Sequence, residues 1–161
     1  MSTRNTMDGT PPRDARVLAD VFADTRYRVL APVDVEVTVG MHCPALERAV
    51  PAGHYGYITA HDPAACPQLA AVNDAADAAL AARLRALSLA HLRMDSQAPD
   101  GSAHELGWLV LDAGDAGMDA LGRAFGQAAV LGWTAGQPVV LRMLMAVPDA
   151  TGPSAWVRWI E

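Results

Sequence analysis

The stretch 104–112, which reads His-Glu-Leu-Gly-Trp-Leu-Val-Leu-Asp, decides how the fold is assigned. Large apolar side chains fall on both faces of this run when it is extended, and strands buried on both faces lie in the middle of a sheet. Turn residues at 98–101 precede the run, and the acidic, glycine-containing loop 112–117 follows it. The run therefore predicts a central strand that leads through a tight turn into a helix.

Hydrophobic periodicity predicts the other elements. Alternating valines over 35–39 indicate a half-buried strand, and Pro63 ends a second strand that covers 55–60. Apolar positions three and four apart predict three helices. The first covers about 14–27 and is capped by Asp14, the second covers about 68–88, and the third begins near Met118 and is ended by Gly126. The remaining expected elements are a short helix over 45–49 and strands over 90–94, 129–133 and 139–147, the last two forming a hairpin.

This order of elements predicts an α+β fold. We expect an antiparallel or mixed sheet with helices on one face, in a ferredoxin-like core order (βαββαβ) with an extra N-terminal helix and flanking strands. Residues 1–12 are expected to form a disordered leader, 13–147 a single α+β domain, and 148–161 a C-terminal tail that packs on the domain. In the tail, the spacing of Trp156 and Trp159 fits either one helical turn or a short strand.

Composition narrows the classes of function. The chain of 161 residues has a net charge of −6 and contains no lysine, so it lacks the basic stripe that favours nucleic acid or anionic membranes. No apolar run reaches the length of a transmembrane helix, and residues 1–12 lack the apolar centre of a secretory signal. Cys43 and Cys66 fit reduced thiols better than a disulfide. We therefore expect a cytoplasmic protein with no nucleic-acid or membrane partner.

Familiar motifs for metal, covalent or phosphate chemistry do not occur. Three histidines and two cysteines fall between positions 42 and 66, but no pair of them has the spacing of a zinc site. No Gly-x-Ser-x-Gly motif marks a nucleophilic serine. The glycine-containing loop 112–117 is acidic and would repel phosphate. We expect no metal site and no cofactor.

Polar residues within apolar elements are the better candidates for function. Asn73 borders the buried stripe of the helix over 68–88, where it serves either as a structural amide that holds a loop or as a ligand-binding group. His61 and Asp62 lie where the strand over 55–60 ends, and scaffolds often present functional groups at such positions. Asp62 also fits an ordinary Asp-Pro turn.

Two further polar residues lie at the ends of elements. Glu105 starts an otherwise apolar strand, and Gln127 follows a glycine at a helix-to-strand junction. Each alone fits a capping or surface role. Together with Thr59 and Asn73, they could converge at one end of the sheet.

Five short motifs follow one another along the chain, namely Thr25-Arg26-Tyr27-Arg28-Val29, Ile58-Thr59-Ala60-His61-Asp62-Pro63, Asn73 with Leu80, Glu105, and Phe125-Gly126-Gln127-Ala128-Ala129-Val130. In this order they resemble the bacterial family of domain of unknown function 3293, over about residues 17–145. The resemblance implies no particular activity. It implies that five candidate residues occupy the family's motif positions: Tyr27, Thr59, Asn73, Glu105 and Gln127.

The chain departs from the pattern of that family close to the candidate site. His61 and Asp62 replace a Trp-Asn pair, which exchanges a neutral aromatic ring and an amide for two titratable groups. Leu106 and Gly107 replace Pro-Ser, and no arginine follows Asn73 within one helical turn. If the family binds an anion through that arginine, this chain is not expected to do so.

Three hypotheses about function follow. The first is a domain that binds a small polar ligand at a strand-end cleft formed by Tyr27, Thr59, His61, Asp62, Asn73, Glu105 and Gln127. The second is a small enzyme that uses His61 as acid or base with Asp62 or Glu105 as its partner. The third is a homodimeric accessory or interaction protein, in which the tryptophans of the tail pack on a partner instead of on their own domain.

Overall fold

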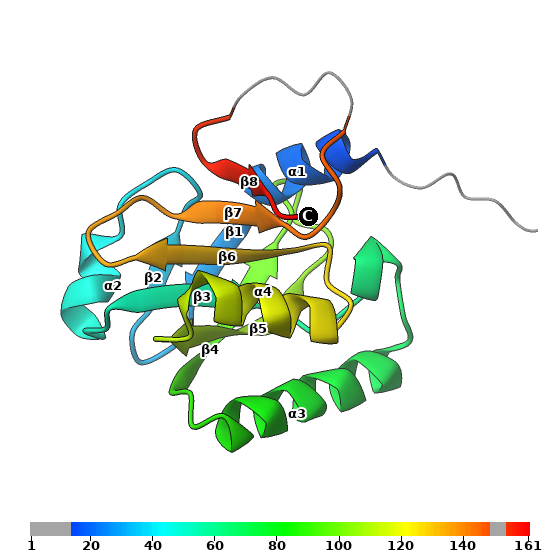
Figure 1. Ribbon diagram of the computed structural model, residues 1–161. Coiled ribbons are helices and arrows are strands. Elements are labelled where there is room, and N and C mark those ends of the chain that lie inside the picture. Colours follow the sequence, from blue (N-terminus) through cyan, green and yellow to red (C-terminus); the bar gives the residue numbers. More distant parts are fainter. Residues whose placement is uncertain (1–13, 149–153) are drawn as a thin grey trace, which may run out of the picture.

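The computed structural model describes residues 14–148 and 154–161, and within these it has an α+β fold with one mixed sheet (Figure 1). The helices are α1 (Ala15–Asp24), α2 (Pro44–Ala49), α3 (Ala70–Ala86) and α4 (Gly114–Ala124), and a 3-10 turn covers Pro63–Ala65. The eight strands are β1 (Arg26–Val29), β2 (Val35–Val37), β3 (His54–Ile58), β4 (His91–Gln97), β5 (Glu105–Leu111), β6 (Ala129–Thr134), β7 (Val140–Met143) and β8 (Val157–Trp159). Their order in the sheet is β2-β1-β4-β5-β3-β6-β7-β8, with neighbours antiparallel except for the parallel pair β7–β8.

The apolar run that opened the sequence analysis forms β5, and its predicted central position is confirmed. β5 lies between β4 and β3, with Asp95 paired to Leu106 on one side and Tyr57 paired to Leu109 on the other. Leu109 and Val110 are fully buried in two separate apolar clusters, one on each face of the sheet. A strand that is apolar on both faces therefore requires cover on both sides.

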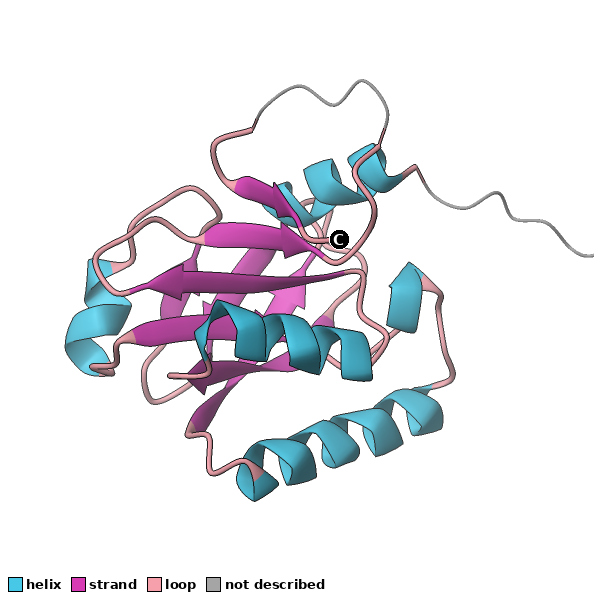
Figure 2. Ribbon diagram, in the orientation of Figure 1, coloured by secondary structure: helices cyan, strands magenta, loops and turns pink. Residues whose placement is uncertain are grey.

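Helices provide that cover on both faces, so the prediction of helices on one face is wrong (Figure 2). Leu18 of α1 and Leu46 of α2 pack in the cluster that contains Tyr55 and Tyr57 of β3. α3 and α4 pack in the cluster on the other face, which contains Ile58. The physical reason is the composition of β3 and β5, which present buried side chains alternately to the two faces.

The sheet curls into a half-barrel. Val39 follows β2 at one end of the sheet and Val139 precedes β7 near the other, yet these two residues form a parallel bridge. The Gly40 N–H donates to the Val139 carbonyl at 2.8 Å, and the Val139 N–H donates to the Met41 carbonyl at 3.0 Å. The ferredoxin-like order is not confirmed as a description of this fold, because the sheet carries four strands beyond such a unit and curls on itself.

Element boundaries differ from the prediction at several places, among them the end of the first helix and the end of the last predicted strand. The first helix ends at Asp24, although Asp14 caps it as expected by accepting from the Arg16 N–H at 2.9 Å. Tyr27 consequently lies in β1, with its side chain buried. The last strand of the predicted hairpin ends at Met143, earlier than the sequence suggested.

The C-terminal residues form β8, so the strand and not the helical turn is the observed arrangement. β8 pairs with β7, and the Ile160 N–H donates to the Met143 carbonyl at 2.8 Å. Trp156 covers Gly40, where a Cβ atom would come within 2.6 Å of its ring. The leader predicted over 1–12 lies outside the described residues.

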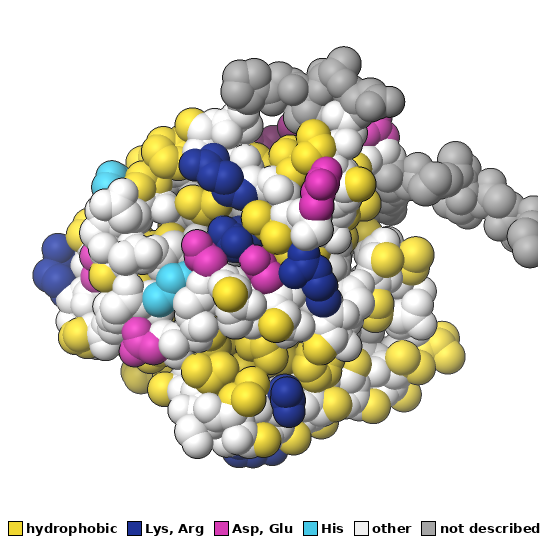
Figure 3. All heavy atoms as spheres, viewed as in Figure 1, with side chains coloured by type: hydrophobic (Ala, Val, Ile, Leu, Met, Phe, Trp, Pro, Cys, Tyr) yellow, Lys and Arg dark blue, Asp and Glu magenta, His cyan; other side chains and the backbone are white. Residues whose placement is uncertain are grey.

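Surface charges are mixed on the face shown in Figure 3, where arginine and acidic side chains lie beside one another among apolar ones. Among the described residues, no helix is both long and apolar enough to cross a membrane.

Candidate functional site

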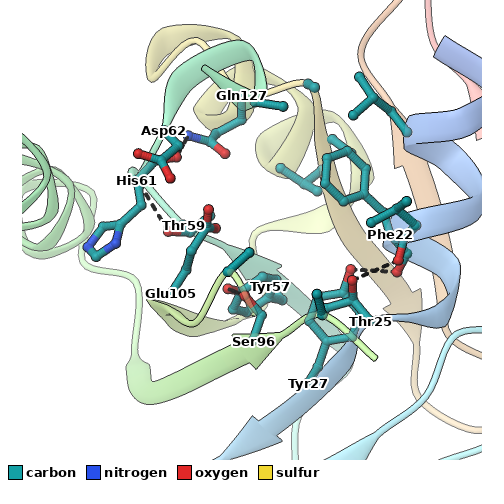
Figure 4. Close-up of a pocket in the computed structure, with 18 of the residues that line it drawn as sticks. Phe22, Thr25, Tyr27, Tyr57, Thr59, His61, Asp62, Ser96, Glu105 and Gln127 are labelled. Carbon is teal, nitrogen blue, oxygen red and sulfur yellow. Dashed lines mark hydrogen bonds between the residues drawn. The ribbon is translucent and has the colours of Figure 1, made fainter. Parts of the chain in front are cut away.

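A cavity lies between α1 and one end of the sheet, where β3 and β4 end and β1, β5 and β6 begin (Figure 4). Its volume of about 180 Å³ is slightly larger than the engineered apolar cavity of roughly 150 Å³ that binds benzene. Three exposed residues, Val21, Pro67 and Ala103, belong to its lining and mark where it opens to solvent. The space therefore suits one small ligand.

The lining of the cavity divides into an apolar wall and a polar end. The apolar wall comes mainly from α1, β6 and β7 and includes Leu18, Val21, Phe22, Leu131 and Leu141. The polar end is formed by residues at or just beyond the ends of elements, namely Thr59, His61, Asp62, Glu105 and Gln127. In Figure 4, Asp62 and Glu105 lie across the cavity from Phe22 and Tyr27.

The loop after β3 is held in place by the motif residues that the sequence analysis selected. The Thr59 hydroxyl donates to the Leu106 carbonyl at 2.8 Å and accepts from the His61 N–H at 3.1 Å. Asn73 accepts from the Asp62 N–H at 3.0 Å and donates its amide to Asp62 Oδ1 at 2.8 Å. Buried polar groups of this kind need such partners, and here they bond to the loop instead of to a ligand.

The Phe-Gly-Gln motif fixes the same loop from the other side. Gly126 ends α4 with a φ of +66°, a conformation that suits glycine, and its carbonyl accepts from the Ala64 N–H at 2.8 Å. A Cβ atom on Gly126 would lie 3.3 Å from Pro63. Gln127 donates its side-chain amide to the His61 carbonyl at 3.0 Å. The motif therefore joins the end of α4 to the loop after β3.

The backbone of this loop is strained. Asp62, Ala64 and Ala65 all have positive φ values, of 45°, 54° and 58°. Non-glycine residues in this region cost roughly 1–3 kcal/mol each, and they persist only where the surroundings fix them. The hydrogen bonds from Thr59, Asn73 and Gln127 supply that constraint and determine the direction of the Asp62 carboxylate.

Asp62 and Glu105 form a pair of carboxyl groups at the polar end. Asp62 Oδ1 is occupied, because it accepts from the Asn73 amide and from the Gln68 N–H, each at 2.8 Å. Glu105 is the neighbouring carboxyl group in the lining, close enough to Asp62 for a hydrogen bond that shares one proton. Burial, followed by the charge of Asp62 and that hydrogen bond, raises the pKa of Glu105 from its ordinary value near 4.5 to about 7.

Two tyrosines and a serine complete the floor of the cavity beside Glu105. The Tyr27 hydroxyl donates to the Phe22 carbonyl at 2.8 Å, and the Tyr57 hydroxyl donates to Ser96 at 2.9 Å. Burial raises the pKa of both tyrosines well above their usual range, so both stay neutral. Ser96 is the cross-strand partner of Glu105, so both side chains lie on the same face of the sheet.

The structure brings six of the seven candidate residues together in the lining of this cavity, namely Tyr27, Thr59, His61, Asp62, Glu105 and Gln127. Asn73 is not in the lining but bonds to Asp62 from behind. The His61 ring makes no hydrogen bond or ion pair within the described part of the chain, and it points away from Glu105 in Figure 4.

Sequence reasoning missed Ser96 and the apolar wall. Ser96 carries no sequence signal of its own, because its place opposite Glu105 depends on the register between β4 and β5. The apolar periodicity over 14–27, which includes Leu18 and Phe22, predicts one buried helix face, but that pattern cannot distinguish a closed core from the wall of a cavity.

The fold and site together define an α+β protein with a curled sheet and a small, partly apolar cavity. Residues 58–130 match a family described as "Protein of unknown function (DUF3293)". The resemblance inferred from the sequence motifs is thus confirmed over this range, which contains Thr59, Asp62, Asn73, Glu105 and Gln127. No curated protein and no solved structure gives a significant match.

Proposed function

We propose that this protein binds a small molecule in the cavity between α1 and the sheet. The observation that carries the proposal is the division of its lining, with an apolar wall on one side and the Asp62–Glu105 pair on the other. Pockets that bind small ligands commonly combine a mostly apolar lining with a few convergent polar groups. A ligand with an apolar body and one polar head would satisfy both parts.

The loop network supports the proposal, because it fixes polar groups that the fold alone would leave mobile. The side chains of Thr59, Asn73 and Gln127 form hydrogen bonds with backbone groups and with Asp62, so they act as positioning residues. The groups that retain free acceptor oxygens are Asp62 and Glu105. Because these two acceptor groups are already held in position, less conformational entropy is lost when a ligand binds.

A fragment screen by ligand-observed NMR and thermal shift tests this function. Ala129 lines the cavity, so Ala129→Leu should fill it and abolish the binding of fragments that bind the wild type. Ala82 lies exposed on α3, and Ala82→Leu is the matched control that should bind normally. Equal binding to both variants, or no bound fragment at all, would contradict the proposal.

An acid–base enzyme is the second candidate. Its specific support is the pKa of about 7 for Glu105, since a catalytic acid or base works best with a pKa near the ambient pH. In this candidate enzyme the acid–base residue is Glu105, whereas the hypothesis from the sequence gave that role to His61. If a fragment that binds is also converted, monitored by mass spectrometry, Glu105→Gln should remove turnover more than binding.

A further inference from the structure

The charged groups around the cavity are of one sign. The titratable residues of its lining are Asp62, Glu105, His61 and the two neutral tyrosines, Tyr27 and Tyr57. None of the ten arginines among the described residues belongs to that lining. A ligand that carries a carboxylate or phosphate would therefore meet two acidic side chains and no arginine.

Several other partly buried carboxylates in the described residues are paired with arginine. Asp119 binds Arg142 through two hydrogen bonds of 2.7 and 2.8 Å, and Asp77 binds Arg93 through two of 2.8 Å. Asp62 and Glu105 form no ion pair within the described residues. Burial and the neighbouring charge of Asp62 instead raise the pKa of Glu105, so one of the two carboxyl groups tends to keep its proton, the usual outcome for two carboxyl groups in one site.

The hydrogen-bonding capacity of the pair also requires a donor. Asp62 Oδ1 already accepts two hydrogen bonds, which leaves Oδ2 for Glu105 and for a ligand. Beyond its bond to Asp62, the Glu105 carboxyl has no hydrogen bond within the described part of the chain. Ionised carboxylates only accept hydrogen bonds, so a partner that completes this end must donate them.

We infer that the ligand of this cavity is a small apolar amine, whose ammonium group binds between Asp62 and Glu105 while its apolar body lies against α1, β6 and β7. This inference rests on the binding function proposed above and names the class of ligand. An ammonium group offers three N–H donors to the two acceptors, and its positive charge compensates one of their two negative charges.

Binding of an ammonium ion should release a proton. In the free protein the Glu105 carboxyl holds its proton up to about pH 7. The groups that face it are Asp62 from the loop, Tyr27 from β1 and Tyr57 from β3. When the cation binds, the O–H bond of the Glu105 carboxyl breaks, the proton passes to solvent, and the carboxylate stays behind as acceptor. Affinity should therefore rise with pH by up to about tenfold per unit until pH 7.

Calorimetry with three probes of similar size tests the class of ligand, namely phenethylamine, 2-phenylethanol and 3-phenylpropanoate. At pH 8, phenethylamine should bind at least about tenfold more tightly than the other two, because hydrogen bonds to charged groups are the stronger ones. At pH 5.5 its affinity should be at least about tenfold lower. At pH 6 its binding enthalpy should depend on the ionisation enthalpy of the buffer, as proton release requires.

Two variants and a control complete the test. Glu105→Gln should lower the affinity for phenethylamine at least about tenfold and remove proton release. Asp62→Asn, which keeps the Oδ1 acceptor of the loop network, should lower affinity similarly. Glu36→Gln, an exposed carboxylate on β2 paired with Arg26, should leave both readouts unchanged.

The outcomes separate the two claims. If the alcohol or the carboxylate binds as tightly as the amine, or if Glu105→Gln binds the amine normally, the amine inference is overturned while the binding function stands. If none of the three probes binds and the fragment screen is also negative, both are overturned.

Discussion

Two acidic sites in this protein have opposite surroundings. Asp119 on α4 is 6% exposed and forms a two-pronged ion pair with Arg142, which also contacts Asp115 at 3.2 Å. The Asp62–Glu105 pair has no arginine and borders a cavity. The first site is complete within the fold, whereas the second is completed by a proton or by a ligand. That difference, and not acidity itself, is the reason for proposing the second site as the ligand-binding site.

The largest expected effect concerns the complete site. Asp119→Ala should lower the free energy of unfolding by about 3 kcal/mol, because it leaves the largely buried Arg142 guanidinium without its main partner. Urea denaturation measures the loss. Glu36→Ala, which breaks an exposed pair at 3.7 Å, should cost less than about 1 kcal/mol. Similar losses for the two variants would show that the Asp119 pair is not structural.

The network behind Asp62 should have the next largest effect. Asn73→Ala removes two hydrogen bonds to Asp62 and leaves its N–H without that partner, so stability should fall by about 2 kcal/mol. Hydrogen exchange at residues 61–66 should accelerate at the same time. Asp74→Ala, on the exposed surface of the same helix, should change stability by less than about 0.5 kcal/mol. If hydrogen exchange at residues 61–66 is unchanged in Asn73→Ala, the Asn73 amide does not position this loop.

The incomplete site should destabilise the free protein at neutral pH. Because the folded-state pKa of Glu105 lies above its ordinary value, its contribution to stability is fully present below about pH 4.5 and is lost as pH rises to about 7. Glu105→Gln cannot ionise, so it should be more stable than wild type at pH 8, by on the order of 1–2 kcal/mol, with a much smaller difference at pH 4.

Urea denaturation of both proteins from pH 4 to 8 measures this difference. Parallel stability profiles, or a Glu105→Gln variant that is less stable than wild type at pH 8, would contradict the description of the pair.

The smallest effect is expected at His61. Its ring makes no hydrogen bond or ion pair among the described residues, so His61→Ala should change stability by less than about 0.5 kcal/mol. It should also leave fragment binding within about threefold of wild type. A loss of fragment binding comparable with that of Glu105→Gln would show that His61 takes part in binding.

The sequence predicted the strands and helices well because their burial follows local periodicity. β5 is recognisable as central from its side chains alone. The curl of the sheet is not, since the bridge between Val39 and Val139 joins residues that are far apart in the chain. The failure to predict helices on both faces has the same origin, because periodicity shows that a face is apolar but not what covers it.

For the candidate site, polar residues in apolar surroundings were a useful signal. They identified Thr59, Asn73 and Gln127, although the roles of these residues are to hold a loop. The contact between Asp62 and Glu105 could not be predicted, because it depends on the left-handed conformation of Asp62 and on the tertiary position of β5. Neither the conformation of Asp62 nor the tertiary position of β5 follows from the hydrophobic periodicity of the sequence.

The carboxyl titration of Glu105, followed by carbon-detected NMR of the free protein, tests the central claim most directly. A pKa of about 7 in the wild type, and a lower pKa in Asp62→Asn, would establish two carboxyl groups that share one site without a compensating cation. A pKa near 4.5 in the wild type would contradict it and leave Glu105 as an ordinary surface carboxylate.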